Sequence, residues 1–379
     1  MNVYLDNAAT TPIDAAVFEA MKPYMMEHFG NPSSIHSHGR KVRSAIEQSR
    51  KKVADLLQVS PAEIFFTSGG TEADNTALRC TVSEKKIQHI ITTKIEHHAV
   101  LHTVETLERR GVKVTYLDLD DNGLIDYSQL EELLKNQPDT LVTLMHGNNE
   151  IGNLLDLERV GAMCAEHKAY FHSDTVQTMA HYVHDLAHLK LDFAVGSAHK
   201  FHGPKGVGFL YINHNTKIHP FIHGGAQERN MRGGTENVYG IVGLAKAMEI
   251  AYEGMDHHRS HIEQLKSRMI SKLQASIEGV AFNGVSDNIE GSLYTVLNAC
   301  LPASDDNDML LFNLDISGVS VSGGSACSSG SSIGSHVLAE LNRDQNRGAV
   351  RFSFSKNNTL EEIDYAAEKL AGLYQPQTV

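Results

Sequence analysis

Short apolar runs typical of buried strands recur between about residue 60 and residue 212. Seven of them are rich in β-branched and aromatic residues: EIFFTS, QHIITT, VKVTYL, TLVTLM, AYFHSD, DFAVGS and GVGFLYI. Stretches with apolar residues at helical spacing separate most of these runs, as in AVLHTVETLERRG and DLERVGAMCAEH. Strands that alternate with helices in this way predict an α/β fold with a mostly parallel, seven-stranded sheet flanked by helices.

Two further regions frame this alternating part. Before it, GRKVRSAIEQSRKKVADLLQV places Val42, Ile46, Val53 and Leu57 on one helical face, which predicts a helix. After it, residues from about 240 to 275 favour helix, and shorter strands and helices follow the VAFNG sequence. A chain of 379 residues usually exceeds one core, so we expect a second, smaller α+β domain with its boundary near residue 255.

Composition excludes several classes of protein. A formal net charge of −13 argues against a nucleic-acid-binding surface, which needs clustered Lys and Arg. The scattered histidines and the unpaired spacing of Cys80, Cys164, Cys300 and Cys327 predict no metal site and no disulfide framework. No apolar run approaches the roughly 20 residues of a membrane span, and MNVYLDNAATT does not look like a signal peptide. We therefore expect no membrane association and a cytoplasmic protein.

A glycine-rich turn follows the first predicted strand, in EIFFTSGGTEADNTAL. Gly69, Gly70 and Thr71 precede a segment with helical character, and backbone N–H groups at such a helix start can bind a phosphate. An ordinary turn and helix cap explains the same three residues equally simply.

Polar residues also follow two later strands. Asp174 and Gln177 come after AYFHSD, and Ser197, His199 and Lys200 leave the strand DFAVGS. Ligands of α/β sheets gather at the carboxyl ends of strands, and a lysine beside an apolar strand suits a Schiff base, which needs a desolvated amine. Taken singly, Asp174 could be a helix cap and Lys200 a solvated loop charge.

Together these three signals are more specific than any one of them. A phosphate-binding turn, an aspartate at a strand end and a lysine match the phosphate, the ring nitrogen and the aldehyde of pyridoxal 5'-phosphate. The combination predicts that this cofactor binds the chain.

One cysteine lies in a composition unlike the rest of the chain. VSVSGGSACSSGSS surrounds Cys327 with glycine, serine and alanine, which build no core but give a segment mobility. Without other signals, an incidental thiol in a linker is the favoured explanation, whereas Cys80, Cys164 and Cys300 lie in apolar contexts that predict burial.

Motifs in a fixed order along nearly the whole chain resemble those of the NifS/IscS-type cysteine desulfurases, within the class V aminotransferase group of fold type I pyridoxal-phosphate enzymes. These motifs are YLDNAATTP, GNPSSIHSHG, TSGGTEADN, EHHAV, NNEIG, HSDTVQ, GSAHKFHGPKG, HGGAQERNMRGGTEN, GGSACSSG and VRFSFS. The resemblance implies a homodimer that converts L-cysteine to L-alanine and passes the sulfur on, for iron-sulfur cluster assembly or other sulfur transfer, to an acceptor or scaffold protein.

The resemblance also assigns cofactor-binding residues. Lys200 would bind the cofactor covalently, Asp174 would pair with the pyridine nitrogen and Gln177 would approach the phenolic oxygen. The phosphate would be held by Thr71, the backbone of Gly70, Ser197 and His199, with Thr235 reaching it from the second subunit.

Further assignments concern the substrate and the chemistry. His97 would stack on the cofactor ring and act as an acid and base. Asn149 would contact both cofactor and substrate, and with Arg351 would take the substrate carboxylate. Cys327 would be the nucleophile that receives the sulfur as a persulfide. Viewed alone, His97 could belong to a surface pair and Arg351 to an ordinary ion pair.

The resemblance further predicts the domain division and leaves alternatives. Residues 15 to 255 would form the large, cofactor-binding domain, and residues 1 to 14 would join residues 256 to 379 in the small domain that carries the cysteine loop. A selenocysteine lyase or related β-eliminating enzyme on the same fold would not need Cys327. A binding protein would have little reason to keep Lys200, Asp174 and Cys327 together, and a Cys/His hydrolase would show no visible absorbance.

Overall fold

The computed structural model describes residues 1–137, 139–304, 307–323, 334–344 and 346–374. Its largest sheet has seven strands in the order β2-β8-β7-β6-β5-β3-β4. These strands are β2 (Ile64–Thr67), β3 (His89–Thr92), β4 (Lys113–Tyr116), β5 (Thr140–Thr143), β6 (Tyr170–Ser173), β7 (Phe193–Ser197) and β8 (Gly208–Ile212). Each corresponds to one of the seven predicted runs. Strand β8 is antiparallel to both of its neighbours, β2 and β7, and the other four strand pairs of the sheet are parallel. The predicted α/β fold with a mostly parallel sheet is therefore confirmed.

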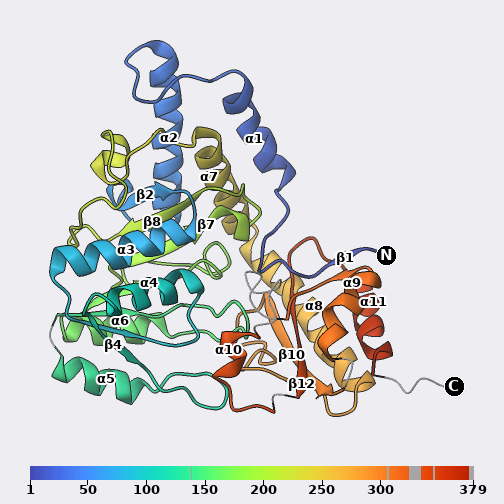
Figure 1. Cartoon of the computed structure of the whole chain (residues 1–379). Helices are drawn as coiled ribbons and strands as arrows, with labels where there is room; N and C mark the ends of the chain where they lie inside the picture. Colours follow the sequence, from blue (N-terminus) through green and yellow to red (C-terminus); the bar gives the residue numbers. More distant parts are fainter. Residues whose placement is uncertain (138, 305–306, 324–333, 345, 375–379) are drawn as a thin grey trace.

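Helices cover both faces of this sheet (Figure 1). On one face pack α1 (Ala15–Met26), α2 (Ser37–Leu56), α5 (Tyr127–Asn136), α6 (Leu157–Glu166) and α7 (Val238–Glu253), and on the other α3 (Gly70–Lys85) and α4 (His98–Glu108). Consecutive strand residues divide between the two faces: Ile90 packs towards α4, whereas Ile91 belongs to the core on the opposite side. Burial on both faces explains why these strands are continuously apolar.

A second group of elements lies to one side of the large sheet (Figure 1). It contains α8 (Met255–Ser276), β9 (Ala281–Phe282), β10 (Val296–Ala303), α9 (Leu310–Ile316), α10 (His336–Ala339), β12 (Arg347–Ser353) and α11 (Leu360–Gly372), together with the pair β1 (Val3–Tyr4) and β11 (Val319–Ser320). Strands β12, β10 and β9 form an antiparallel sheet, and β1 pairs with β11 in parallel. Four short 3-10 helices complete the described elements: η1 (Pro61–Glu63), η2 (Ala198–Lys200), η3 (Gln227–Asn230) and η4 (Asn307–Met309).

Two large hydrophobic clusters correspond to these two groups of elements. The first joins the seven-stranded sheet to helices as far along the chain as α7. The second joins α8, α11, β10 and β12 to Val3 and Leu5 near the N-terminus. Gly254 separates α7 from α8. The clusters support a division near residue 255, and the exact domain bounds stay a prediction.

The segment from Leu5 to Asp14 crosses between the two groups. Its backbone bonds to Ser353 at the end of β12, and further along Thr11 N donates to His199 O at 2.9 Å. The segment thereby places β12 beside η2, at the carboxyl end of β7. No helix within the described ranges is both long enough and apolar enough to cross a bilayer.

Candidate active site

A cavity of about 240 Å³ lies at the carboxyl ends of the parallel strands. The loops that follow β3, β5, β6 and β7 all contribute to it, as do the start of α3, the N-terminal segment and β12. Ten of the residues predicted for the site line this cavity: Gly70, Thr71, His97, Asn149, Asp174, Gln177, Ser197, His199, Lys200 and Arg351. Adjacent parallel strands end at the same edge of a sheet, so residues far apart in sequence meet there.

Lys200 is held at the centre of this arrangement by the main chain. It ends η2, immediately after β7, and its Nζ donates to Ala8 O at 2.5 Å and to Ala9 O at 2.9 Å. The surrounding backbone is fixed by Thr11, whose hydroxyl donates to His199 O and accepts from His202 N. The amine therefore has a defined position inside the cavity.

Asp174 and Gln177 approach the cavity from the turn after β6. Asp174 is buried, and its Oδ1 accepts a hydrogen bond from Val176 N at 2.9 Å. Gln177 Nε2 donates to Ala8 O at 3.0 Å, the same oxygen that Lys200 contacts. Asp174 thus stabilises the turn that follows β6 and lines the cavity; no helix starts there among the described elements, so it is not the helix cap of the simpler interpretation.

The start of α3 forms one wall of the cavity. Gly69 precedes the helix with φ +154°, and Gly70 is its first residue. A Cβ on Gly70 would lie 2.9 Å from Val176 Cγ2, so a larger residue would collide with the cavity wall. The N–H groups of a first helical turn have no intrahelical acceptor, and the helix dipole favours an anion there. This wall is suited to a phosphate group.

Two histidines of the cavity are neutral near pH 7. Burial lowers the pKa of His199 to about 4, and its Nδ1 lies 3.1 Å from Thr10 Oγ1. Burial also lowers the pKa of His97, an effect that the charge of Asp174 opposes. Nδ1 of His97 accepts from Ala99 N at 3.1 Å and caps α4, so the neutral ring carries its proton on Nε2.

Arg351 reaches the cavity from β12 in the second group of elements. Its Nη1 donates to Asn149 O at 2.9 Å and its Nη2 to Asp6 Oδ1 at 2.7 Å. Its Nε is buried and has no hydrogen-bond partner within the described chain. Arg351 forms an ion pair with Asp6, as the simpler interpretation allowed, and it also lines the cavity. The two hydrogen bonds use two of the five N–H groups of its guanidinium.

Sequence comparison is decisive for the family. The model of the class-V aminotransferases matches residues 3–366. A putative cysteine desulfurase, IscS 1, of Bacillus subtilis (strain 168) is 45% identical over 381 residues, which covers 99% of each chain. The chain belongs to the cysteine desulfurases.

Other relatives agree with this assignment. A cysteine desulfurase IscS of Dictyoglomus turgidum is 44% identical and covers 97% of this chain and 93% of its own. Among solved structures, a NifS-like protein superposes with a TM-score of 0.90 at 40% identity, covering 98% of this chain and 99% of its own. The structure titled "SspA in complex with cysteine" superposes with a TM-score of 0.82 at 33% identity, covering 94% of this chain and 100% of its own.

One described site residue of the cysteine desulfurase chain lies outside this cavity. Thr235 lines a separate cavity of about 130 Å³, together with Ser68 and Arg232. Its predicted contact comes from a second subunit and stays a prediction. Cys327 lies within residues 324–333, outside the described residues.

Asp74 lines the cavity although sequence reasoning did not select it. Burial raises the pKa of its carboxyl group well above the usual range, and the charges of Asp174 and Glu96 act in the same direction. Burial lowers the pKa of His172 to about 3, and His172 Nε2 lies 3.2 Å from Asp74 Oδ1. Burial also raises the pKa of Glu96, to about 8. Asp74 belongs to the motif TSGGTEADN. It lies one helical turn after Gly70 in α3, which places it beside Gly70 at the cavity.

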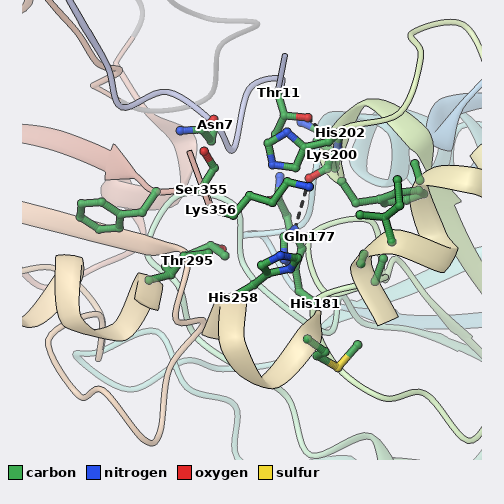
Figure 2. Close-up of a pocket in the computed structure, with 18 of the residues that line it drawn as sticks. Asn7, Thr11, Gln177, His181, Lys200, His202, His258, Thr295, Ser355 and Lys356 are labelled. Carbon is green, nitrogen blue, oxygen red and sulfur yellow. Dashed lines mark hydrogen bonds between the residues drawn. The ribbon is translucent and has the colours of Figure 1, made fainter. Parts of the chain in front are cut away.

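A smaller cavity is also lined by Lys200 (Figure 2). Its volume of about 30 Å³ has room for about one water molecule. It shares Ala8, Gln177 and Lys200 with the larger cavity, and His181 and His258 also line it. Asp174, His97 and Arg351 line the larger of these two cavities and not the smaller.

Cysteines outside the glycine-serine segment are buried, as predicted. Cys80, Cys164 and Cys300 are buried free thiols, and burial raises the pKa of Cys80 to about 11. Among the described residues, no group of three or more His, Cys, Asp or Glu side chains could hold a metal ion.

Proposed function

We propose that this chain is a pyridoxal-phosphate-dependent cysteine desulfurase that converts L-cysteine to L-alanine and receives the sulfur on Cys327 as a persulfide. The observation that carries the proposal is the meeting of Lys200, Asp174 and Arg351 at one cavity in a chain of this family. An amine, a carboxylate and a guanidinium are the groups needed for the aldehyde and ring nitrogen of the cofactor and for the substrate carboxylate.

The residues present fit the cofactor. Lys200 would hold it covalently, and Asp174 would pair with its ring nitrogen. The phosphate would lie at the first turn of α3, where Gly70 leaves room, near the side chains of Ser197 and His199. When bound, pyridoxal phosphate supplies an electron sink that stabilises negative charge on the substrate carbon.

The remaining residues bind the substrate and move protons. Arg351 would orient the α-carboxylate, and the amine of Lys200 would carry the α-proton. His97, neutral near pH 7, presents Nε2–H as a proton donor. Asn149 supports Arg351 through its main-chain oxygen.

Sulfur transfer is assigned to Cys327 on the family motif GGSACSSG. Its thiolate sulfur would form a bond to the sulfur of the substrate. The carbon–sulfur bond of the substrate breaks, and its electron pair stays with the carbon, which takes up a proton and becomes the methyl group of alanine. Cys327 is left as a persulfide that an acceptor thiol can take.

Assembly and destination are further parts of the proposal. We infer a homodimer in which Thr235 reaches the phosphate of the neighbouring subunit. Apolar side chains exposed on and after α1, namely Met26, Phe29 and Ile35, support a covered surface there. The large domain would span residues 15 to 255, the enzyme would act in the cytoplasm, and a sulfur acceptor would serve iron-sulfur cluster assembly or another transfer.

Colour is the direct test of this function. The purified protein, reconstituted with pyridoxal phosphate, is expected to be yellow, and borohydride should remove the visible band and leave the cofactor attached to the peptide that contains Lys200. L-cysteine should yield L-alanine in amounts equal to the sulfur released with dithiothreitol. A protein that stays colourless after reconstitution would contradict the proposal.

The pH dependence of turnover follows from His97. Its pKa is lowered in the folded protein, so the ring is neutral at pH 7 and becomes protonated only below the usual histidine value of about 6.5. Protonation would convert Nδ1 from acceptor to donor and break the cap on Ala99 N. We therefore expect kcat/KM to fall on the acid side with a midpoint below about 6.5. The measurement is alanine formation against pH for the wild type and His97→Asn, and an unchanged profile in the variant would exclude His97.

A further inference from the structure

Asp6 contacts the cavity residue Arg351 but does not itself line the cavity, and the family motif gave it no role. It lies in YLDNAATTP, between β1 and the cavity residue Ala8. Its Oδ1 accepts two hydrogen bonds, from Arg351 Nη2 at 2.7 Å and from Ser322 Oγ at 2.9 Å. One carboxylate oxygen therefore joins the N-terminal segment to β12 and to the residue that follows Val321.

The exposure of the two charged groups shows why this contact matters. The side chain of Arg351 is 1% exposed and that of Asp6 is 18% exposed. A buried cation needs a partner close by, because removal from water otherwise disfavours its charged form strongly. Asp6 is the carboxylate that makes this ion pair with Arg351 in the described chain.

The contacts of Arg351 also fix the direction of its guanidinium. A guanidinium has five N–H groups. One bonds to Asn149 O and one to Asp6 Oδ1, on two different nitrogens. Nε, the third nitrogen, is buried and has no hydrogen-bond partner among the residues that the structure describes. The two contacts restrict rotation of the guanidinium, use two of its five N–H groups, and belong to a residue that lines the cavity.

We propose that Asp6 is a positioning residue for amino-acid recognition: through Oδ1 it holds Arg351 in the orientation that binds the α-carboxylate of the substrate. The proposal rests on the proposed function, in which Arg351 takes that carboxylate. Asp6 is not among the residues that line the cavity, so it would act through Arg351. Its charge also opposes the incoming carboxylate, so it lowers the affinity that an uncompensated arginine would have while it supplies the geometry.

Two conservative variants separate geometry from charge. Asp6→Asn keeps an oxygen at the Oδ1 position, which can accept from both Arg351 and Ser322, but removes the charge. Asp6→Glu keeps the charge but moves the oxygens by one methylene group. If the position of Oδ1 orients Arg351, Asp6→Asn should retain or increase the affinity for the amino acid, and Asp6→Glu should lower this affinity. Asp6→Ala loses both and is expected to weaken binding by about tenfold or more.

The experiment is titration calorimetry of L-alanine into the reconstituted dimer, because this ligand has the α-carboxylate but no thiol to transfer. L-alaninamide, which lacks the carboxylate charge, should bind wild type and variants alike. The matched control is Asp14→Ala, which breaks another ion pair of the same segment, that of Asp14 with Lys356 at 2.7 Å. This control should leave the affinity for L-alanine unchanged.

Each outcome is informative. Wild-type affinity in Asp6→Ala, or retained affinity in Asp6→Glu with loss in Asp6→Asn, overturns the proposal, and the Asn and Glu variants decide it even if Asp6→Ala does not fold. Turnover of L-cysteine, followed separately, tests the proposed function. Normal turnover without any change in affinity contradicts only the role of Asp6. Absent turnover of wild type, with the expected changes in affinity, contradicts only the desulfurase activity.

Discussion

Lys200→Ala is expected to abolish the formation of alanine from L-cysteine while the protein remains folded. The amine is needed to bind the cofactor covalently and to move the α-proton, and loss of the proton transfer alone costs about 10²- to 10⁴-fold in rate. Folding should persist because Thr11 still holds the backbone of η2 through His199 O and His202 N, and neither bond involves the side chain of Lys200.

The measurement combines turnover with circular dichroism and the visible spectrum after reconstitution. Lys205→Ala is the matched control, since Lys205 lies in the same loop with an exposed side chain. It should retain wild-type turnover. Turnover of Lys200→Ala at the rate of this control would remove Lys200 from the mechanism, and with it the covalent attachment on which the proposed function depends.

The sheet could be predicted from the sequence because its strands are buried on both faces. In β3, Ile90 and Ile91 pack into different clusters on opposite sides, and in β5 Leu141 and Val142 do the same. Both faces therefore require apolar residues, which makes a strand visible as a continuous run. The direction of a strand could not be predicted in the same way, because the apolar pattern of β8 does not show that it runs antiparallel to β7.

The site could be predicted in its residues but not in its contacts. The amine of Lys200 is held by main-chain oxygens, and such acceptors are present at every position, so Ala8 and Ala9 carry no signal in the sequence. Asp6 and Arg351 are separated by 345 positions, and their pairing depends on how the N-terminal segment meets β12. The motifs contain the predicted site residues that line the cavity. The contact that orients Arg351 depends on the packing of the N-terminal segment against β12.

Charge in the cavity depends on burial that the sequence does not reveal. Asp74, Glu96 and His172 look like ordinary polar residues in the sequence. Burial raises the pKa of both carboxyl groups, that of Glu96 to about 8, and lowers the pKa of the imidazole to about 3. Burial therefore disfavours the charged form of each of these three groups, a shift that the residue types alone do not predict.

Cys327→Ser is expected to stop sulfur transfer while the binding of L-cysteine remains. Lys200, Asp174 and Arg351 are unchanged in this variant, so the substrate should still alter the visible spectrum. A serine hydroxyl is essentially un-ionised near pH 7 and cannot replace a thiolate in attack on sulfur. No alanine and no sulfide should form.

Mass spectrometry of the intact protein and of its peptides separates this expectation from its alternatives. Wild type treated with L-cysteine should gain about 32 Da, one sulfur atom, on the peptide that contains Cys327, and dithiothreitol should remove it. The variant should gain no such mass. Cys80→Ser is the matched control, because this buried thiol has a pKa raised to about 11 and is inert near neutral pH; it should behave as wild type. If Cys327→Ser released alanine and sulfur at the wild-type rate, a β-eliminating enzyme that needs no cysteine nucleophile would explain the chain better.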